Sequence, residues 1–167
     1  LIVDIVPNHM AASLENAWWR DVIEWGAGSR YARHFDIDWS ERLTLPTLGK
    51  DFSGILADGD LRLDVDRDDG RLVLAYFENR FPLAPSTYRR LGNAVDGGVL
   101  KDIASLGADA SAGTAEAFHA AVAGLLASDA VAEQLDRDLA RLSGDHALIT
   151  ALHEAQSGFF DQSVTRP

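Results

Sequence analysis

The pattern of apolar and polar positions predicts a buried strand at the start of the chain, followed by a helix. Residues 1–6 form a nearly continuous apolar run with one aspartate, which is typical of a strand buried on both faces. Residues 14–25 place Trp18, Val22 and Trp25 at helical spacing behind Asn16, a residue type that caps helices. Residues 35–39 alternate apolar and acidic side chains, which predicts a short strand.

The middle of the chain carries the pattern of a β-hairpin. Residues 61–65 alternate, residues 66–70 form a polar stretch that ends in glycine, and residues 71–77 are rich in β-forming residues. We therefore expect a hairpin over about 61–77. The two prolines in 81–85 are expected to end it, and a short helix is expected at 51–56.

Alanine becomes frequent after residue 92, and the apolar spacing there predicts helices. Residues 114–127, 128–142 and 146–156 read as three helices of an antiparallel array. The predicted class is α+β. The predicted division is a strand and loop at 1–12, a mixed α/β segment at 13–92, a helical array at 93–156 and an irregular end at 157–167.

The composition of the chain excludes some kinds of binding partner and metal site. The chain has 167 residues, 47% of them hydrophobic, a formal net charge of -11 and no cysteine. The acidic balance argues against nucleic acid and against anionic membranes. The absence of cysteine excludes disulfides and thiolate metal sites, and it is consistent with a cytoplasmic location. No apolar run approaches the roughly 20 residues that span a bilayer.

Polar residues gather where the first strand meets the following loop. Asp4 lies within the apolar run, and Asn8 and His9 follow Pro7. An acid inside such a strand needs a hydrogen-bond partner. In parallel barrels, polar groups at the carboxyl end of a strand face the active site. The alternative is a locally satisfied aspartate and a solvated histidine.

These residues resemble a known family. The segment DIVPNHM is similar to a strand-three segment of the α-amylase family of glycoside hydrolases, whose catalytic domain is a (β/α)8 barrel. The continuation through the paired tryptophans, SRYA, FDIDW, LPTLGK and ENRFPLAP resembles the maltooligosyl trehalose synthase branch of that family. The resemblance covers roughly residues 1–90 and returns at LHEAQ, residues 152–156. It implies that the chain is an excerpt: barrel strand three with the B-domain insertion that follows.

The resemblance implies an intramolecular transglycosylation that turns the reducing-end α-1,4 bond of a maltooligosaccharide into an α,α-1,1 bond. That chemistry needs a nucleophile and an acid/base carboxyl about 5 Å apart. In the family these lie on later barrel strands, so we expect no catalytic residue and no activity in this excerpt alone. By the same resemblance, His9 is expected to bind sugar, Asp4 to support the site and Asn8 to order the loop. No cofactor or metal is expected.

Further sugar-contacting residues come from basic and aromatic side chains. Lys50 and Arg80 sit in stretches shared with the family and are candidates for binding hydroxyl groups. Trp18, Trp19 and Trp39 are candidates for stacking on sugar rings, although core packing is favoured for any single one. Adjacent Trp18 and Trp19 cannot both face one core, so one of them is expected at the surface.

The expected partners are a maltooligosaccharide and the rest of the parent barrel, with no nucleic acid and no membrane. Two alternatives remain open. One is an autonomous, non-catalytic module that binds an oligosaccharide or a partner protein. The other is an excerpt of a different α-amylase-family hydrolase.

Overall fold

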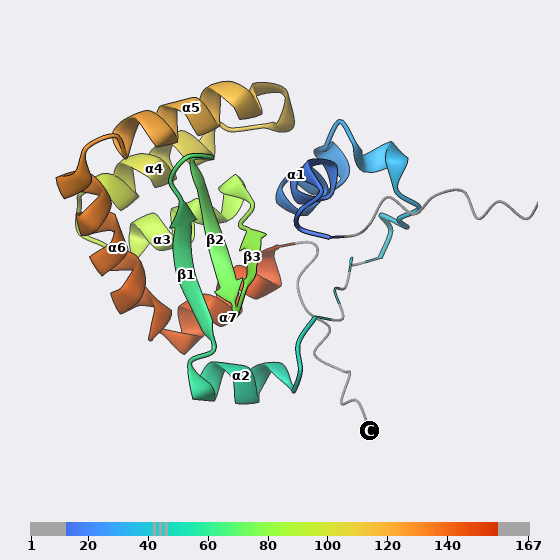
Figure 1. The fold of residues 1–167 in the computed structure, drawn as a ribbon, viewed down its shortest axis with the longest axis horizontal. Helices are drawn as coiled ribbons and strands as arrows, with labels where there is room; N and C mark the ends of the chain where they lie inside the picture. The colour runs from blue at the N-terminus through green and yellow to red at the C-terminus, as the bar shows by residue number, and fades with distance from the viewer. Residues whose placement is uncertain (1–12, 42, 44, 46, 157–167) are drawn as a thin grey trace, which may run out of the picture.

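A computed structural model describes residues 13–41, 43, 45 and 47–156, and this part of the chain has a mixed α+β fold (Figure 1). It contains seven α-helices and one three-stranded antiparallel sheet, which is open and not a closed barrel. The α-helices are α1 (Ala17–Trp25), α2 (Phe52–Asp58), α3 (Tyr88–Asn93), α4 (Val99–Ala108), α5 (Ala115–Leu125), α6 (Asp129–Ser143) and α7 (His146–Ala155). The strands are β1 (Leu61–Asp66), β2 (Arg71–Tyr76) and β3 (Asn79–Pro82), in the order β1-β2-β3. The predicted α+β class is confirmed.

The predicted hairpin is confirmed as β1 and β2, which pair with Leu63 opposite Leu74. The chain leaves the sheet at Pro82, within the stretch expected to end it, but residues 79–82 first add a third strand, β3, that was not predicted. Pro82 is tolerated because it is the last residue of an edge strand, where no ladder hydrogen bond depends on its nitrogen.

The strand expected at Phe35–Trp39 is absent. The Asp38 carboxylate accepts hydrogen bonds from the Ser40 amide at 2.9 Å and from the Ser40 hydroxyl at 2.6 Å. The Ile37 amide donates to the Phe35 carbonyl at 3.1 Å. These local bonds bend the backbone and compete with strand pairing. The Phe35 ring packs on Trp19 instead.

The predicted helices form where the capping residues indicate. Asn16 accepts from the Trp18 amide at the start of α1, and Asp51 accepts from the Gly54 amide at the start of α2. The three helices predicted for the second half are α5, α6 and α7. Helices α3 and α4 were not among the predicted elements.

Side chains from the C-terminal part of the chain form hydrogen bonds with the backbone at both edges of the sheet. On β1, the outward amide of Leu63 donates to the Ser143 hydroxyl at 2.8 Å. On the other edge, the Gln156 amide accepts from Ala84 N–H at 2.8 Å and donates to the Pro82 carbonyl at 2.7 Å. Unpaired strand edges invite association with other chains, and these contacts remove part of that exposure.

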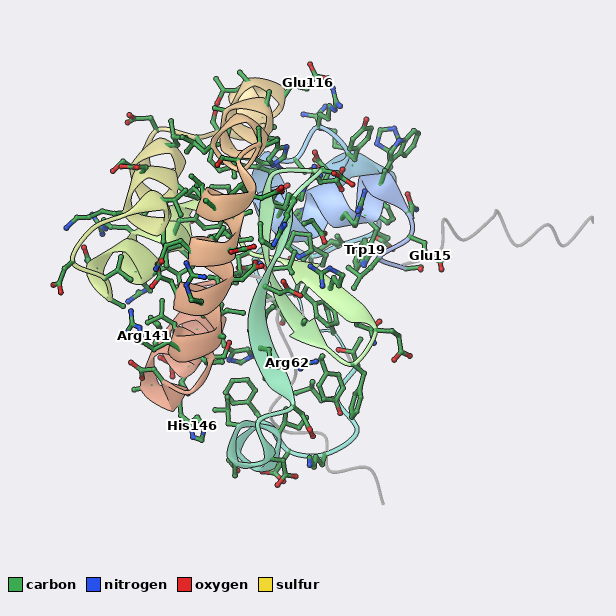
Figure 2. The ribbon with its side chains drawn as sticks, turned by 60° about the vertical axis from the view of Figure 1, so that its left-hand side comes forward. Glu15, Trp19, Arg62, Glu116, Arg141 and His146 are labelled. Atoms are coloured by element: carbon green, nitrogen blue, oxygen red, sulfur yellow. The ribbon has the colours of Figure 1, made fainter. Side chains whose placement is uncertain are left out.

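Helices flank the sheet at both edges, with α6 beside β1 and α1 beside β3. Trp19 of α1 and Arg141 of α6 lie on opposite sides of it (Figure 2). The side chains of Leu61, Leu63 and Val65 on β1 are buried, whereas alternate positions carry charged groups. One hydrophobic cluster runs from α1 through the sheet to α7. The hairpin and the helical array therefore share a core.

The hairpin turn is held against α5. Gly70 has φ +61°, and a Cβ built at this position would lie 2.2 Å from the His119 carbonyl oxygen. Glycine is required here both for the backbone conformation and for the close approach.

Among the described residues, no single helix has the length and apolarity to cross a membrane. Taken together, Ala112–Leu125 and Asp129–Ser143 meet that test by length and composition, but they are bent by 102° at the break between them.

Candidate functional site

The three residues predicted at the first strand, Asp4, Asn8 and His9, lie outside the described residues. Their predicted roles stay predictions. The candidate site within the described residues therefore rests on two basic side chains, three tryptophans and a cavity that Arg80 lines.

Lys50 precedes α2, and its side chain contacts two aspartates at the C-terminal end of that helix. Its ammonium group forms ion pairs with Asp58 and with Asp60, the latter at 3.2 Å. Hydrogen bonds to Asp58 first and Asp60 second raise the pKa of Lys50. The side chain is 40% exposed, so one side of the group stays open to solvent.

Arg80 lies on β3 but binds acids on β1. Its Nε donates to Asp66 and its Nη1 to Asp64, both at 2.6 Å. The residue paired with Arg80 on β2 is Ala75, whose small side chain leaves room for the guanidinium to cross the middle strand. Arg80 is thus an ordered cation on the charged face of the sheet.

The ion pair with Arg80 affects the pKa of the Asp64 carboxyl group. Burial raises the pKa of Asp64, but hydrogen bonds from the Arg80 guanidinium and the Val65 amide, together with the charges of Arg80 and Arg62, outweigh this effect. The pKa of Asp64 therefore lies below its ordinary value.

The paired tryptophans divide as expected. Trp19 is 5% exposed and belongs to the core, whereas Trp18 is 36% exposed. Trp39 is half-buried and packs against the core. Of the three stacking candidates, Trp18 is the most exposed.

The exposed Trp18 ring is part of an aromatic cluster. It stacks on Tyr31, with ring centroids 4.8 Å apart and planes at 10°, and meets His34 edge-on at 4.9 Å. The Arg30 guanidinium lies 4.9 Å from the centroid of the Tyr31 ring. Such a flat, partly exposed aromatic surface can accept the apolar C–H face of a sugar ring.

A buried ionic network joins α1, the hairpin and α5, and sequence reasoning missed it. The fully buried carboxylate of Glu24 accepts from Arg71 Nε at 3.0 Å and contacts His119 Nε2 at 2.9 Å. Arg71 also pairs with Asp69 at 3.2 Å, and Asp69 with Arg20 at 3.1 Å. The only sequence signal is an acid inside the apolar stretch VIEW at 22–25. Its partners are distant in sequence and could not have been named.

Tyr88 lies beneath this network. It is fully buried, and its hydroxyl accepts a hydrogen bond from the Leu72 amide at 3.0 Å. Burial first, and the Glu24 carboxylate second, raise the pKa of Tyr88. The phenol is therefore held neutral, as a structural acceptor within the core.

A cavity with a volume of about 660 Å³ lies at the charged face of the sheet. Arg20, Asp66, Glu78, Asn79 and Arg80 contribute to its wall. Among the described residues, no group of three or more histidine or acidic side chains is placed to hold a metal ion. What the surface offers chemically is hydrogen bonding and aromatic stacking.

Comparison with known proteins gives a partial similarity. No family model matches the chain, and no solved structure matches it. Two proteins of Mycobacterium tuberculosis, from strains CDC 1551 / Oshkosh and ATCC 25618 / H37Rv, are each named "Putative maltooligosyl trehalose synthase". Each is 48% identical to this chain over 68 residues, which is 36% of this chain and 9% of the relative. The chain thus matches less than a tenth of the length of these curated relatives, and over about a third of its own length it is similar to a maltooligosyl trehalose synthase.

Proposed function

We propose that this chain is a segment of a maltooligosyl trehalose synthase and forms part of the wall of its substrate cleft. The observation that carries the proposal is the 48% identity over 68 residues to two proteins of that name. The motifs LPTLGK and ENRFPLAP, which contain Lys50 and Arg80, support it.

The proposed reaction is an isomerisation. The α-1,4 bond at the reducing end breaks, and the released glucose unit is joined again through its own anomeric oxygen. The product has an α,α-1,1 bond, and no atom is gained or lost. The two carboxyl groups that carry out this retaining chemistry are proposed to lie outside these 167 residues.

The role proposed for the described residues is binding. Lys50 and Arg80 are held by carboxylates yet remain partly exposed, so their free N–H groups can donate to sugar hydroxyls. The Trp18 ring supplies an apolar platform for a sugar ring. In this proposal the segment orients the glucan and excludes water, which would otherwise turn transfer into hydrolysis.

The test is the reaction of the full-length protein with maltopentaose. The proposal expects reducing ends to disappear while no free glucose accumulates beyond a minor amount. A hydrolase would instead create new reducing ends, and a binding module would leave the sugar unchanged. Either result would overturn the proposal.

The 167-residue chain alone is expected to be inactive in the same assay. Rapid conversion of maltopentaose by this chain would contradict the placement of the catalytic carboxyl groups elsewhere.

A further inference from the structure

The cavity at the charged face of the sheet is built from three separate stretches of chain. One is the turn before α1 together with Arg20, the second is the end of β1 with the β1–β2 turn, and the third is the start of β3. Its volume of about 660 Å³ falls within the range of small-molecule sites. We refer to this cavity as the sheet groove.

Fixed donors line the sheet groove. Arg80 is held by Asp64 and Asp66, each at 2.6 Å, and Arg20 is held by Asp69 at 3.1 Å. A guanidinium has five N–H groups, and the contacts of Arg80 with the two aspartates occupy two of them. The remaining donors are held in place before any ligand arrives, which reduces the entropy lost on binding.

Acceptors lie beside these donors. The exposed carboxylates of Glu15 and Glu78 line the groove, and no salt bridge to another described residue holds either of them. The Asn79 side chain adds an amide that can both donate and accept. Donors and acceptors therefore line the same groove.

The backbone of the β2–β3 turn, which positions Glu78 and Asn79, is strained. Phe77, directly before Glu78, has φ +51° and is 64% exposed. A bulky residue in the left-handed region is unfavourable, and such strain concentrates at functional sites. The turn fixes where Glu78 and Asn79 leave the sheet.

The mixture of charges selects the class of ligand. The wall carries five acidic and three basic side chains, so phosphates and other anions meet net repulsion. A metal ion has no group of three ligands among the described residues. An uncharged polyhydroxylated ligand suits the groove, because each hydroxyl can donate to a carboxylate and accept from a guanidinium.

We propose that the sheet groove is a binding site for glucosyl units of an α-glucan, with Arg20, Arg80, Glu78 and Asn79 as its polar contacts. The ligand class rests on the proposed function, whereas the site rests on the geometry of the groove. It is separate from the aromatic surface of Trp18 and from Lys50.

The direct test is a titration of the purified chain with maltopentaose, followed through the arginine Nε–H signals by NMR. We expect the signals of Arg20 and Arg80 to shift in the millimolar range. The Arg89 signal, from an exposed residue of α3, should stay in place. The double variant Glu78→Ala/Asn79→Ala should weaken the binding about tenfold, as expected for two lost hydrogen bonds.

Three results would overturn the inference. These are no shift of Arg20 and Arg80, equal shifts of all arginines, or shifts caused by inorganic phosphate and not by maltopentaose. The readout is binding to the chain and not turnover by the full-length protein, so the two proposals can fail separately. If the full-length protein isomerises maltopentaose but the Arg20 and Arg80 signals do not shift, only the proposed binding site is refuted. If the signals shift but no isomerisation occurs, only the proposed reaction is refuted.

Discussion

Arg71 on β2 donates its Nε–H to the fully buried carboxylate of Glu24 on α1 across 3.0 Å. The other oxygen of Glu24 meets His119 of α5 at 2.9 Å. One carboxylate therefore ties together three elements that lie far apart in the sequence. Because α1 carries Trp18 and Arg20, this link also positions the proposed sugar contacts.

Breaking that link should destabilise the chain strongly. Glu24→Gln leaves Arg71 largely buried without its main counter-charge, and we expect the free energy of unfolding to fall by about 3 kcal/mol. The control is Glu133→Gln, which removes an exposed i,i+4 pair with Arg137 and should change stability by less than about 0.5 kcal/mol. Urea denaturation measures both. Equal effects of the two substitutions would contradict the structural role of Glu24.

The hairpin turn should tolerate no side chain at Gly70. Gly70→Ala strains a backbone at φ +61° and also places a methyl group against the His119 carbonyl, so we expect a loss of about 3 kcal/mol. Gly59→Ala is the matched control, because φ is +71° there and no atom lies within 4 Å of the added Cβ. It should lose only about 1 kcal/mol. Thermal unfolding measures both losses. Equal losses of stability for the two variants would show that the turn does not pack on α5.

The adjacent tryptophans should respond differently to truncation. Trp19→Ala empties a core position and should cost about 3 to 5 kcal/mol. Trp18→Ala removes an exposed ring stacked on Tyr31 and should cost about 1 kcal/mol. Chemical denaturation distinguishes the two substitutions. A larger loss for Trp18→Ala would reverse the assignment of core and surface.

The Arg80–Asp64 pair predicts a dependence of stability on pH in the acid range. The pKa of Asp64 is lower in the folded chain than in the unfolded chain, so its contribution is present above the unfolded pKa of about 4 and is lost as the pH falls through the folded value. Asp64→Asn should flatten this part of the stability curve. Arg80→Gln should flatten it as well, because it removes the hydrogen bond that lowers the pKa of Asp64. Curves parallel to that of the unchanged chain would refute this pairing.

The sequence predicted those elements whose signals are local. Apolar spacing and capping residues indicated α1, α5, α6 and α7, and alternation indicated the β1–β2 hairpin. Strand β3 was missed because Pro82 argues against a central strand and says less about the end of an edge strand. Apolar and acidic residues alternate over 35–39 as in a strand, but Asp38 forms a local hydrogen bond with Ser40 and the segment does not pair with another strand.

The site was predictable only in part. A surface position for one of Trp18 and Trp19 followed from their adjacency, but the choice between them depends on how α1 packs. The partners of Arg80 and Glu24 come from register and tertiary packing, which no single stretch of sequence reveals. The sheet groove is likewise assembled from three stretches of chain.

The most direct test of the central claim is proton NMR of maltopentaose during incubation with the full-length protein. We expect reducing-end anomeric signals to be replaced by the signal of an α,α-1,1 bond, with the total amount of oligosaccharide unchanged. Growth of the reducing-end signals, or an unchanged spectrum at high protein concentration, would contradict it.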